Sequence, residues 1–245
     1  MCLLRACVAC GILHVSRKPL YISRASSRPK CDAYCVMTLN TIRRFGAQEI
    51  VSLRQKCLLY PNHIIPISGD IPKIDVLKTR KRAAVLIPLC NFKGLPSVIF
   101  TLRSATVGTH RNQVSFPGGH INEGESDVEA AIRETREELG AKIGDIEILG
   151  QCQLVPAITG TIVTPVLGFL SEEFTDYSLF EPNASEVDRV FIRSLDQLMD
   201  PSYNTSEEYQ RLGKTTTLPV FGPNEGDERI WGLTAFILKI GRAHV

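Results

Sequence analysis

The chain of 245 residues lacks any apolar run of the ~18–20 residues that a membrane-spanning helix needs. It also lacks a basic excess in its body. The first 31 residues hold six basic residues and no acidic one, which leaves 22 Lys and Arg against 26 Asp and Glu in the rest. Proteins that bind nucleic acid usually carry a basic surface. We therefore expect no membrane span and no nucleic-acid partner.

Cysteine is scarce outside the N-terminal segment. Five of the eight cysteines fall within the first 35 residues, and only Cys57, Cys90 and Cys152 are scattered through the rest of the chain. A disulfide framework needs cysteines grouped throughout the folded part. The distribution therefore favours a domain without disulfides, from a reducing compartment.

The N-terminal segment contains Arg and Ser but no acidic residue before Asp32. Residues 1–36 therefore have the composition of a mitochondrial transit peptide. A secretory signal is the weaker alternative, because most basic residues follow the apolar stretch 6–15 instead of preceding it. A cytosolic or peroxisomal location stays open, since residues 240–245 resemble a translated sequencing adaptor that would have replaced any C-terminal signal. We predict a mitochondrial protein with a non-native tail.

Turn and breaker residues divide the remainder into an N-terminal segment, 37–79, and a main domain, 80–240. In the first, apolar residues between 41 and 59 recur at helical spacing, and prolines then favour an extended linker. In the second, many apolar stretches typical of strands stand beside few helical ones, which predicts an α+β sandwich rather than a doubly wound sheet. We expect strands at 83–90, 97–102, 146–155, 161–170, 187–192, 216–221 and 230–240, a hairpin loop at 91–96 and a short helix at 194–199.

The segment from residue 119 to residue 141 carries most of the chemical information. Ser126 followed three residues later by Glu129 is a capping box, and Gly140 is a helix stop. Together they predict a helix over residues 127–139. Its apolar stripe is expected to face the core, with three carboxylates clustered on the opposite side: Glu134, Glu137 and Glu138.

Carboxylates within one helical turn repel one another, and each like-charged pair destabilises a bare helix by roughly 0.2–0.5 kcal/mol. A hard divalent cation reverses that effect, because Mg²⁺ and Mn²⁺ prefer carboxylate oxygens. Upstream, Gly118 and Gly119 lack the side chains that would keep a ligand or the helix at a distance. Arg133 can pair with Glu125 or Glu137 and hold the acidic edge in place. The segment therefore predicts a metal-assisted site for a phosphate-containing substrate.

At these positions the sequence resembles the Nudix box. That motif takes Gly, five residues, Glu, seven residues, Arg-Glu, two residues, Glu-Glu, one residue and Gly, and it corresponds here to residues 119–141. The resemblance implies an α/β/α sandwich with a mixed sheet, a substrate with a nucleoside diphosphate linked to another moiety, and Mg²⁺ or Mn²⁺ as cofactor. It also implies the metal ligands Glu134, Glu137 and Glu138 and the structural positions Gly118, Gly119, Glu125, Arg133 and Gly140.

Segments outside the box resemble the coenzyme A diphosphatase branch of this family, and a mitochondrial member most of all. Residues 101–104 and 113–119 carry this similarity, together with His110 and residues 230–235. The resemblance implies hydrolysis of coenzyme A or acyl-CoA to 3′,5′-ADP and 4′-phosphopantetheine or its acylated form, with Arg103 and His110 binding the substrate. Gly108 and Asn112 stand where the branch usually has Arg and Gly, so NADH, ADP-ribose or a nucleotide sugar stays an alternative substrate.

The identity of the base is left between two residues. Glu137 is either a third metal ligand or the base, and Glu186, outside the box, is the other candidate base. We predict Trp231 to belong to the core rather than to stack on a nucleotide base. The expected partner is a small molecule, coenzyme A or acyl-CoA, and a homodimer is left open.

Overall fold

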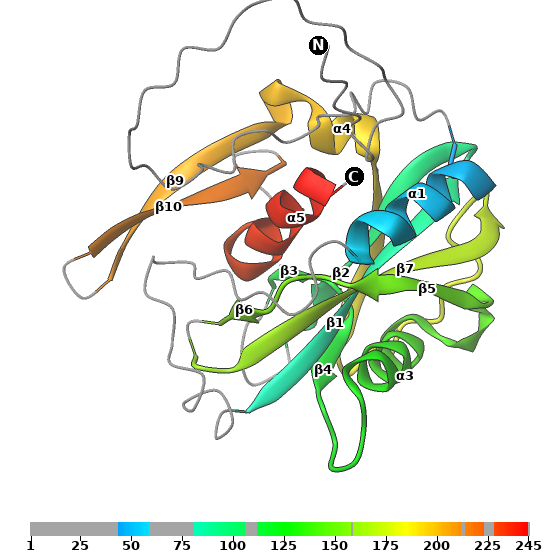
Figure 1. The fold of residues 1–245 in the computed structure, drawn as a ribbon, viewed down its shortest axis with the longest axis horizontal. Coiled ribbons are helices and arrows are strands. Elements are labelled where there is room, and N and C mark those ends of the chain that lie inside the picture. The colour runs from blue at the N-terminus through cyan, green and yellow to red at the C-terminus, as the bar shows by residue number, and fades with distance from the viewer. Residues whose placement is uncertain are drawn as a thin grey trace, which may run out of the picture. The chain divides into compact units, whose positions relative to one another are not determined.

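A mixed β-sheet lies at the centre of the structure (Figure 1). The predicted transit peptide, most of the segment 37–79 and His110 lie outside the described residues. The computed structural model describes residues 44–58, 81–105, 112–157, 159–211, 214–222 and 228–244.

Eight strands form the central sheet, in which β3-β2-β1-β7-β5 follow one another and β4, β6 and β8 pair with β1, β7 and β2. β1 and β7 run parallel and the other pairs are antiparallel, so the sheet is mixed. A separate hairpin is formed by β9 and β10. The bounds are β1 Arg82–Phe92, β2 Leu95–Arg103, β3 Val114–Ser115, β4 Gly118–His120, β5 Ile146–Gln151, β6 Val155–Pro156, β7 Ile162–Phe174, β8 Val187–Ser194, β9 Asn204–Arg211 and β10 Lys214–Phe221.

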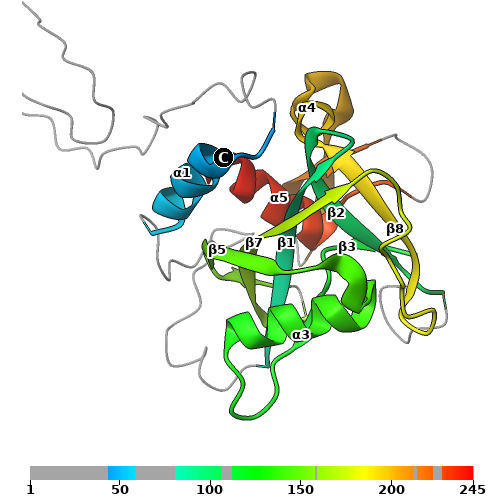
Figure 2. The ribbon, with the colours of Figure 1, turned by 90° about the vertical axis from the view of Figure 1, so that its right-hand side faces the viewer.

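Helices cover both faces of this sheet. Along β1, Ile87 and Leu89 point into the core shared with α1 (Ala47–Leu58) and α5 (Gly232–His244), whereas Ala84 and Leu86 point into the core under α3 (Asp127–Leu139). This is the alternation that the period of two along a strand requires. Figure 2 shows α3 on one side of the sheet and α1 and α5 on the other. The predicted α/β/α sandwich is confirmed.

Local sequence determines both ends of α3. The Ser126 hydroxyl accepts a hydrogen bond from the Glu129 N–H at 3.2 Å, and the Glu129 carboxylate accepts one from the Ser126 N–H at 2.9 Å. At the other end the Gly140 N–H donates to the Arg136 carbonyl at 3.0 Å. The helix spans the predicted residues, because its caps are all within the segment.

Most predicted strands are confirmed with small changes. The hairpin loop expected at 91–96 is tighter, because β1 continues to Phe92, β2 begins at Leu95 and only Lys93 and Gly94 form the turn. The stretch 146–155 holds two strands, β5 and β6. The short helix after Ser194 is α4 (Leu195–Met199), followed by one 3₁₀ turn, Pro201–Tyr203; another, Ala141–Ile143, follows α3.

The strand expected at residues 230–240 is wrong, because this stretch forms most of α5. The buried side chains of Ala235, Ile237 and Leu238 pack into the same core as α1. The Thr234 hydroxyl donates to the Val114 carbonyl at 3.0 Å and ties α5 to β3. Trp231, expected in the core, is 40% exposed just before the helix. Among the described helices, none is both long and apolar enough to cross a membrane.

Candidate active site

Two glycines let β4 lie close to both β1 and α3. Gly118 and Gly119 lie opposite Val85 and Ala84 of β1. A Cβ at Gly118 would lie 2.4 Å from the Ala84 carbonyl oxygen, and one at Gly119 would lie 2.4 Å from the Glu134 carboxyl carbon. Gly118 is therefore needed for strand pairing, and Gly119 makes room for the Glu134 carboxylate above the strand.

Three carboxylates converge beside these glycines. Oxygens of Glu134, Glu138 and Glu186 all lie within 4.8 Å of one another. Glu134 and Glu138 are four residues apart on α3 and project from one side of the helix. Glu138 is buried, and the other two are half-buried. We call these three residues the carboxylate cluster.

The chain just before β8 holds Glu186 in the cluster. The Asn183 N–H donates to the Glu138 carbonyl at 3.4 Å, which ties this loop to the last turn of α3. The Asn183 carbonyl accepts from the N–H groups of Glu186 and Val187 at 2.9 and 2.8 Å. The Ser104 N–H donates to the Glu186 carbonyl at 2.8 Å, next to the end of β2. Glu186 is thus positioned by α3, inside the Nudix box, and by the residue that follows β2, outside it.

Glu138 is the most confined member of the cluster, with an exposed fraction of 1%. Its carboxylate accepts a hydrogen bond from the Thr101 hydroxyl at 3.4 Å and lies 3.9 Å from the Arg103 guanidinium. Burial raises the pKa of Glu138 to about 7, and the charges of Glu134 and Glu186 add to that rise, whereas Arg103 and the Gly118 N–H lower it. Without a bound cation, the three carboxylates of the cluster therefore resist being ionised at the same time.

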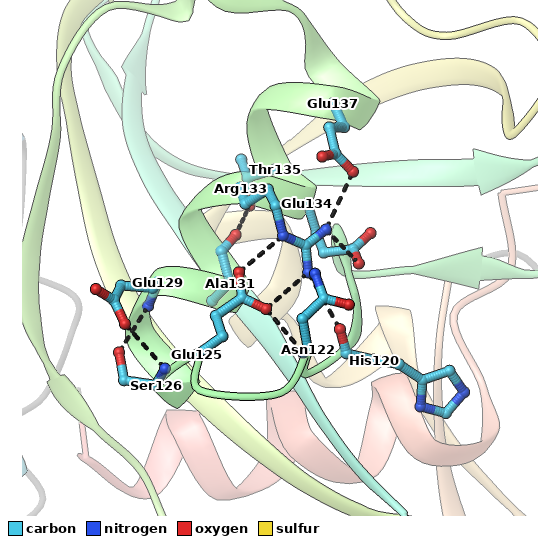
Figure 3. Close-up of polar contacts among 10 residues, drawn as sticks. All are labelled: His120, Asn122, Glu125, Ser126, Glu129, Ala131, Arg133, Glu134, Thr135 and Glu137. Carbon is cyan, nitrogen blue, oxygen red and sulfur yellow. Dashed lines mark hydrogen bonds and ion pairs between the residues drawn. The ribbon is translucent and has the colours of Figure 1, made fainter.

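Arg133 connects the rest of the box (Figure 3). Its guanidinium donates to both carboxylate oxygens of Glu125 at 2.7 and 3.0 Å, to Glu134 at 2.8 Å and to Glu137 at 3.2 Å. It also donates to the His120 carbonyl at 3.1 Å. These bonds lower the pKa of Glu125 and raise that of Arg133. Arg133 thereby ties the loop after β4 to α3 and orients the Glu134 carboxylate.

The donor set of the cluster fits a hard divalent cation. All its ligand atoms are carboxylate oxygens, which Mg²⁺ and Mn²⁺ prefer. Burial is the main cause of the raised pKa of Glu138, and a bound cation would reverse the smaller contribution, the repulsion from Glu134 and Glu186. The nearby Arg103 guanidinium supplies a positive charge that can bind a phosphate oxygen.

The structure brings most of the predicted site residues together. Glu186 joins Glu134 and Glu138, whereas Glu137 is outside this group, with a side chain 51% exposed and bound to Arg133. Glu137 as a metal ligand stays a prediction, as does His110 in substrate binding. The expectation that Glu138 lies on the side of α3 opposite its core-facing stripe is wrong, because this side chain is buried and contacts Thr101 of β2.

Sequence reasoning missed two hydroxyl groups that support the site. Thr101 is fully buried on β2, and its hydroxyl contacts the Ser115 hydroxyl at 3.0 Å as well as Glu138. Thr101 and Ser115 are opposite each other in the β2–β3 pair. The sequence offered two signals: both residues lie in the branch-like segments 101–104 and 113–119, and Thr101 is a polar residue between Phe100 and Leu102.

The match to a known domain model decides the family. The NUDIX domain model matches residues 80–211, which include every described residue of the cluster. The chain belongs to the Nudix hydrolase family. The Nudix box of this family corresponds to residues 119–141, which supply Glu134, Glu138, the two glycines and Arg133 to the site.

Relatives of this Nudix hydrolase include two proteins named mitochondrial coenzyme A diphosphatase NUDT8. The mouse protein is 39% identical over 161 residues, which cover 64% of this chain and 75% of the relative. The human protein is 40% identical over 160 residues, which cover 64% of this chain and 66% of the relative. Nudix hydrolase 3 of Caenorhabditis elegans is 36% identical over 188 residues, 71% and 77%. The mitochondrial names of the first two agree with the location predicted from the N-terminal composition.

Proposed function

We propose that this Nudix hydrolase cleaves the diphosphate bond of coenzyme A or acyl-CoA. The products would be 3′,5′-ADP and 4′-phosphopantetheine or its acylated form. Support comes from the names of the mouse and human relatives and from the branch-like residues 101–104 and 230–235. The observation that carries the hydrolytic part is the carboxylate cluster beside Arg103.

We assign Mg²⁺ or Mn²⁺ to Glu134, Glu138 and Glu186. When bound there, the cation supplies charge neutralisation at the diphosphate and a lower pKa of the attacking water. Glu186 takes the third place that the box alone gave to Glu137, since its carboxylate is in the cluster and that of Glu137 is not. Arg133 keeps Glu134 turned toward the cluster through its 2.8 Å hydrogen bond.

Two further side chains act on the substrate in this proposal. Arg103, whose side chain is 26% exposed, would bind a phosphate oxygen at the edge of the cluster. Glu137 would accept the proton of the attacking water. Its carboxylate is half-exposed, lies on the same helix as the cluster and has Arg133 as its hydrogen-bond partner.

The proposed setting is mitochondrial, with residues 1–36 as the transit peptide. A fusion of residues 1–36 to a fluorescent protein should be imported into mitochondria, and replacing its arginines by glutamine should stop the import. A diffuse cytosolic signal from the unchanged fusion would refute this assignment without affecting the proposed reaction.

A substrate panel tests the function. Coenzyme A, acetyl-CoA, a long-chain acyl-CoA, NADH and ADP-ribose are incubated with the full chain and Mg²⁺ or Mn²⁺, and the products are resolved by mass. We expect the highest kcat/KM for a coenzyme A species, with 3′,5′-ADP as one product. Faster cleavage of NADH or ADP-ribose would instead favour another nucleoside diphosphate derivative, in keeping with Gly108 and Asn112.

A further inference from the structure

Two buried thiols, far apart in the sequence, meet on the face of the sheet opposite α3. Cys57 lies next to the last residue of α1, and Cys152 directly follows β5. Both belong to the core that α1 and α5 share with the sheet. Neither takes part in the carboxylate cluster.

Gly150 explains how α1 comes so close to β5. A Cβ at Gly150 would lie 2.5 Å from the Cys57 Cβ and 3.3 Å from its Sγ. Cys57 therefore occupies the place that a side chain at residue 150 would fill. Cys152 is two residues further along the chain, and its thiol is hydrogen-bonded to that of Cys57.

We propose that Cys57 and Cys152 form a reversible redox site that takes a hydroperoxide as its oxidant and closes a disulfide between α1 and β5. Both thiols are free in the structure, so the site is present in its reduced form. The bridge would join neighbouring segments of the chain, because α1, which carries Cys57, packs on β5, which Cys152 directly follows.

The chemistry has a preferred order. The hydrogen bond from Cys152 lowers the pKa of Cys57, whereas donating that bond and being buried raise the pKa of Cys152. Cys57 thus supplies the attacking thiolate. It attacks one peroxide oxygen, the O–O bond breaks, and the products are a Cys57 sulfenic acid and, after protonation, one water from hydrogen peroxide or one alcohol from an organic hydroperoxide.

The second step closes the bridge. Cys152 attacks the Cys57 sulfur, the S–O bond breaks, and the hydroxyl leaves with the Cys152 proton as water. Two thiols are oxidised by two electrons and one peroxide is reduced. A thiol reductant reverses the reaction by exchange.

Cys90 provides a matched control. It is also free, fully buried and in the described part of the chain, but it lies in a different core, and burial raises its pKa to about 12. It has no cysteine partner there. The redox site therefore predicts oxidation at Cys57 and Cys152 but not at Cys90.

The test is peptide mapping of the native full chain after treatment with hydrogen peroxide. We expect a cross-link between the tryptic peptides that contain Cys57 and Cys152, its loss on reduction with dithiothreitol, and unmodified Cys90. The linked protein should unfold roughly 5–10 °C higher than the reduced one, because the bridge closes a long loop. Cys57→Ala should lose both the link and the peroxide-induced shift, and Cys90→Ala should keep both.

Peptide mapping of the wild-type protein tests the proposal even if a variant fails to fold. Native protein whose Cys57 and Cys152 stay as thiols, or whose Cys57 is over-oxidised without a link, would overturn the proposal. A link that forms only after urea has unfolded the chain would overturn it as well.

Discussion

Replacing Glu138 by Gln separates the two roles of the buried carboxylate. The substitution keeps the size of the side chain and removes a charge that is almost fully buried. Burial raises the pKa of Glu138 from 4.5 to about 7 in the folded protein, so ionising it there costs on the order of 3 kcal/mol more than in the unfolded chain. Because the pKa of Glu138 is higher in the folded state, the protonated carboxyl stabilises the fold. This stabilisation is fully present below the unfolded pKa and is lost as the pH rises through about 7.

The expected result has two parts. Without metal, Glu138→Gln should be more stable than the wild type at pH 8 by up to about 3 kcal/mol, and the difference should shrink toward pH 5. With Mn²⁺, the same variant should lose at least ~100-fold in kcat/KM, since the cluster has lost an ionised ligand. We therefore expect a more stable but much less active protein.

Urea unfolding in EDTA at pH 5 and pH 8, together with turnover in Mn²⁺, measures both parts. The matched control is Glu172→Gln, an exposed glutamate at the far end of β7. It should change neither the pH dependence of unfolding nor the rate. The reasoning fails if folded Glu138→Gln retains the wild-type rate, or if its pH dependence of stability equals that of the wild type.

Two other substitutions probe the supports of the cluster. Gly119→Ala should fold but bind Mn²⁺ roughly 10–100-fold more weakly, because the new Cβ would displace the Glu134 carboxylate. A Mn²⁺ titration monitored by electron paramagnetic resonance measures the affinity, and an unchanged affinity would contradict this prediction. Thr101→Val should weaken Mn²⁺ binding by about tenfold and Thr101→Ser should restore it, whereas Thr164→Val, at a buried hydroxyl with no partner among the described residues, should leave it unchanged. Equal losses in the Thr101→Val and Thr164→Val proteins would show that any buried hydroxyl has this effect.

Helix α3 shows what local sequence can determine. Its first and last residues were predictable because Ser126, Glu129 and Gly140 supply the capping interactions within a few residues of each end. The same locality made the pairing of Arg133 with Glu125 and Glu137 predictable.

Elements defined by distant partners were harder to predict. The apolar run after Ile230 has the composition of a strand, and only its packing under the sheet selects a helix. β9 has the polar sequence Asn-Thr-Ser-Glu-Glu-Tyr-Gln-Arg, and it forms a strand because β10 pairs with it. No periodicity in either stretch contains that information.

The orientation of the carboxylates was a tertiary question of the same kind. Around α3, Glu138 is adjacent to the buried Thr135 as well as to Glu134, so a helical projection alone could not assign it to either side. Strand β4 and the loop before β8 cover Glu138 and thereby place its side chain in the interior. The membership of Glu186 depended on the pairing of β8 with β2, which lies outside the box.

The pairing of β8 with β2, which places Glu186 in the carboxylate cluster, has a consequence for the lifetime of the protein in the cell. The three carboxylates are assembled only in the folded chain, so a cation that binds them is bound to the folded state alone. At a free cation concentration of 100 times Kd, this linkage adds about 2.7 kcal/mol to the free energy of unfolding, or a roughly hundredfold smaller unfolded fraction. Cation depletion would then increase the population that proteases can degrade, and the compartment's supply of divalent metal would set the abundance of the enzyme as well as its rate.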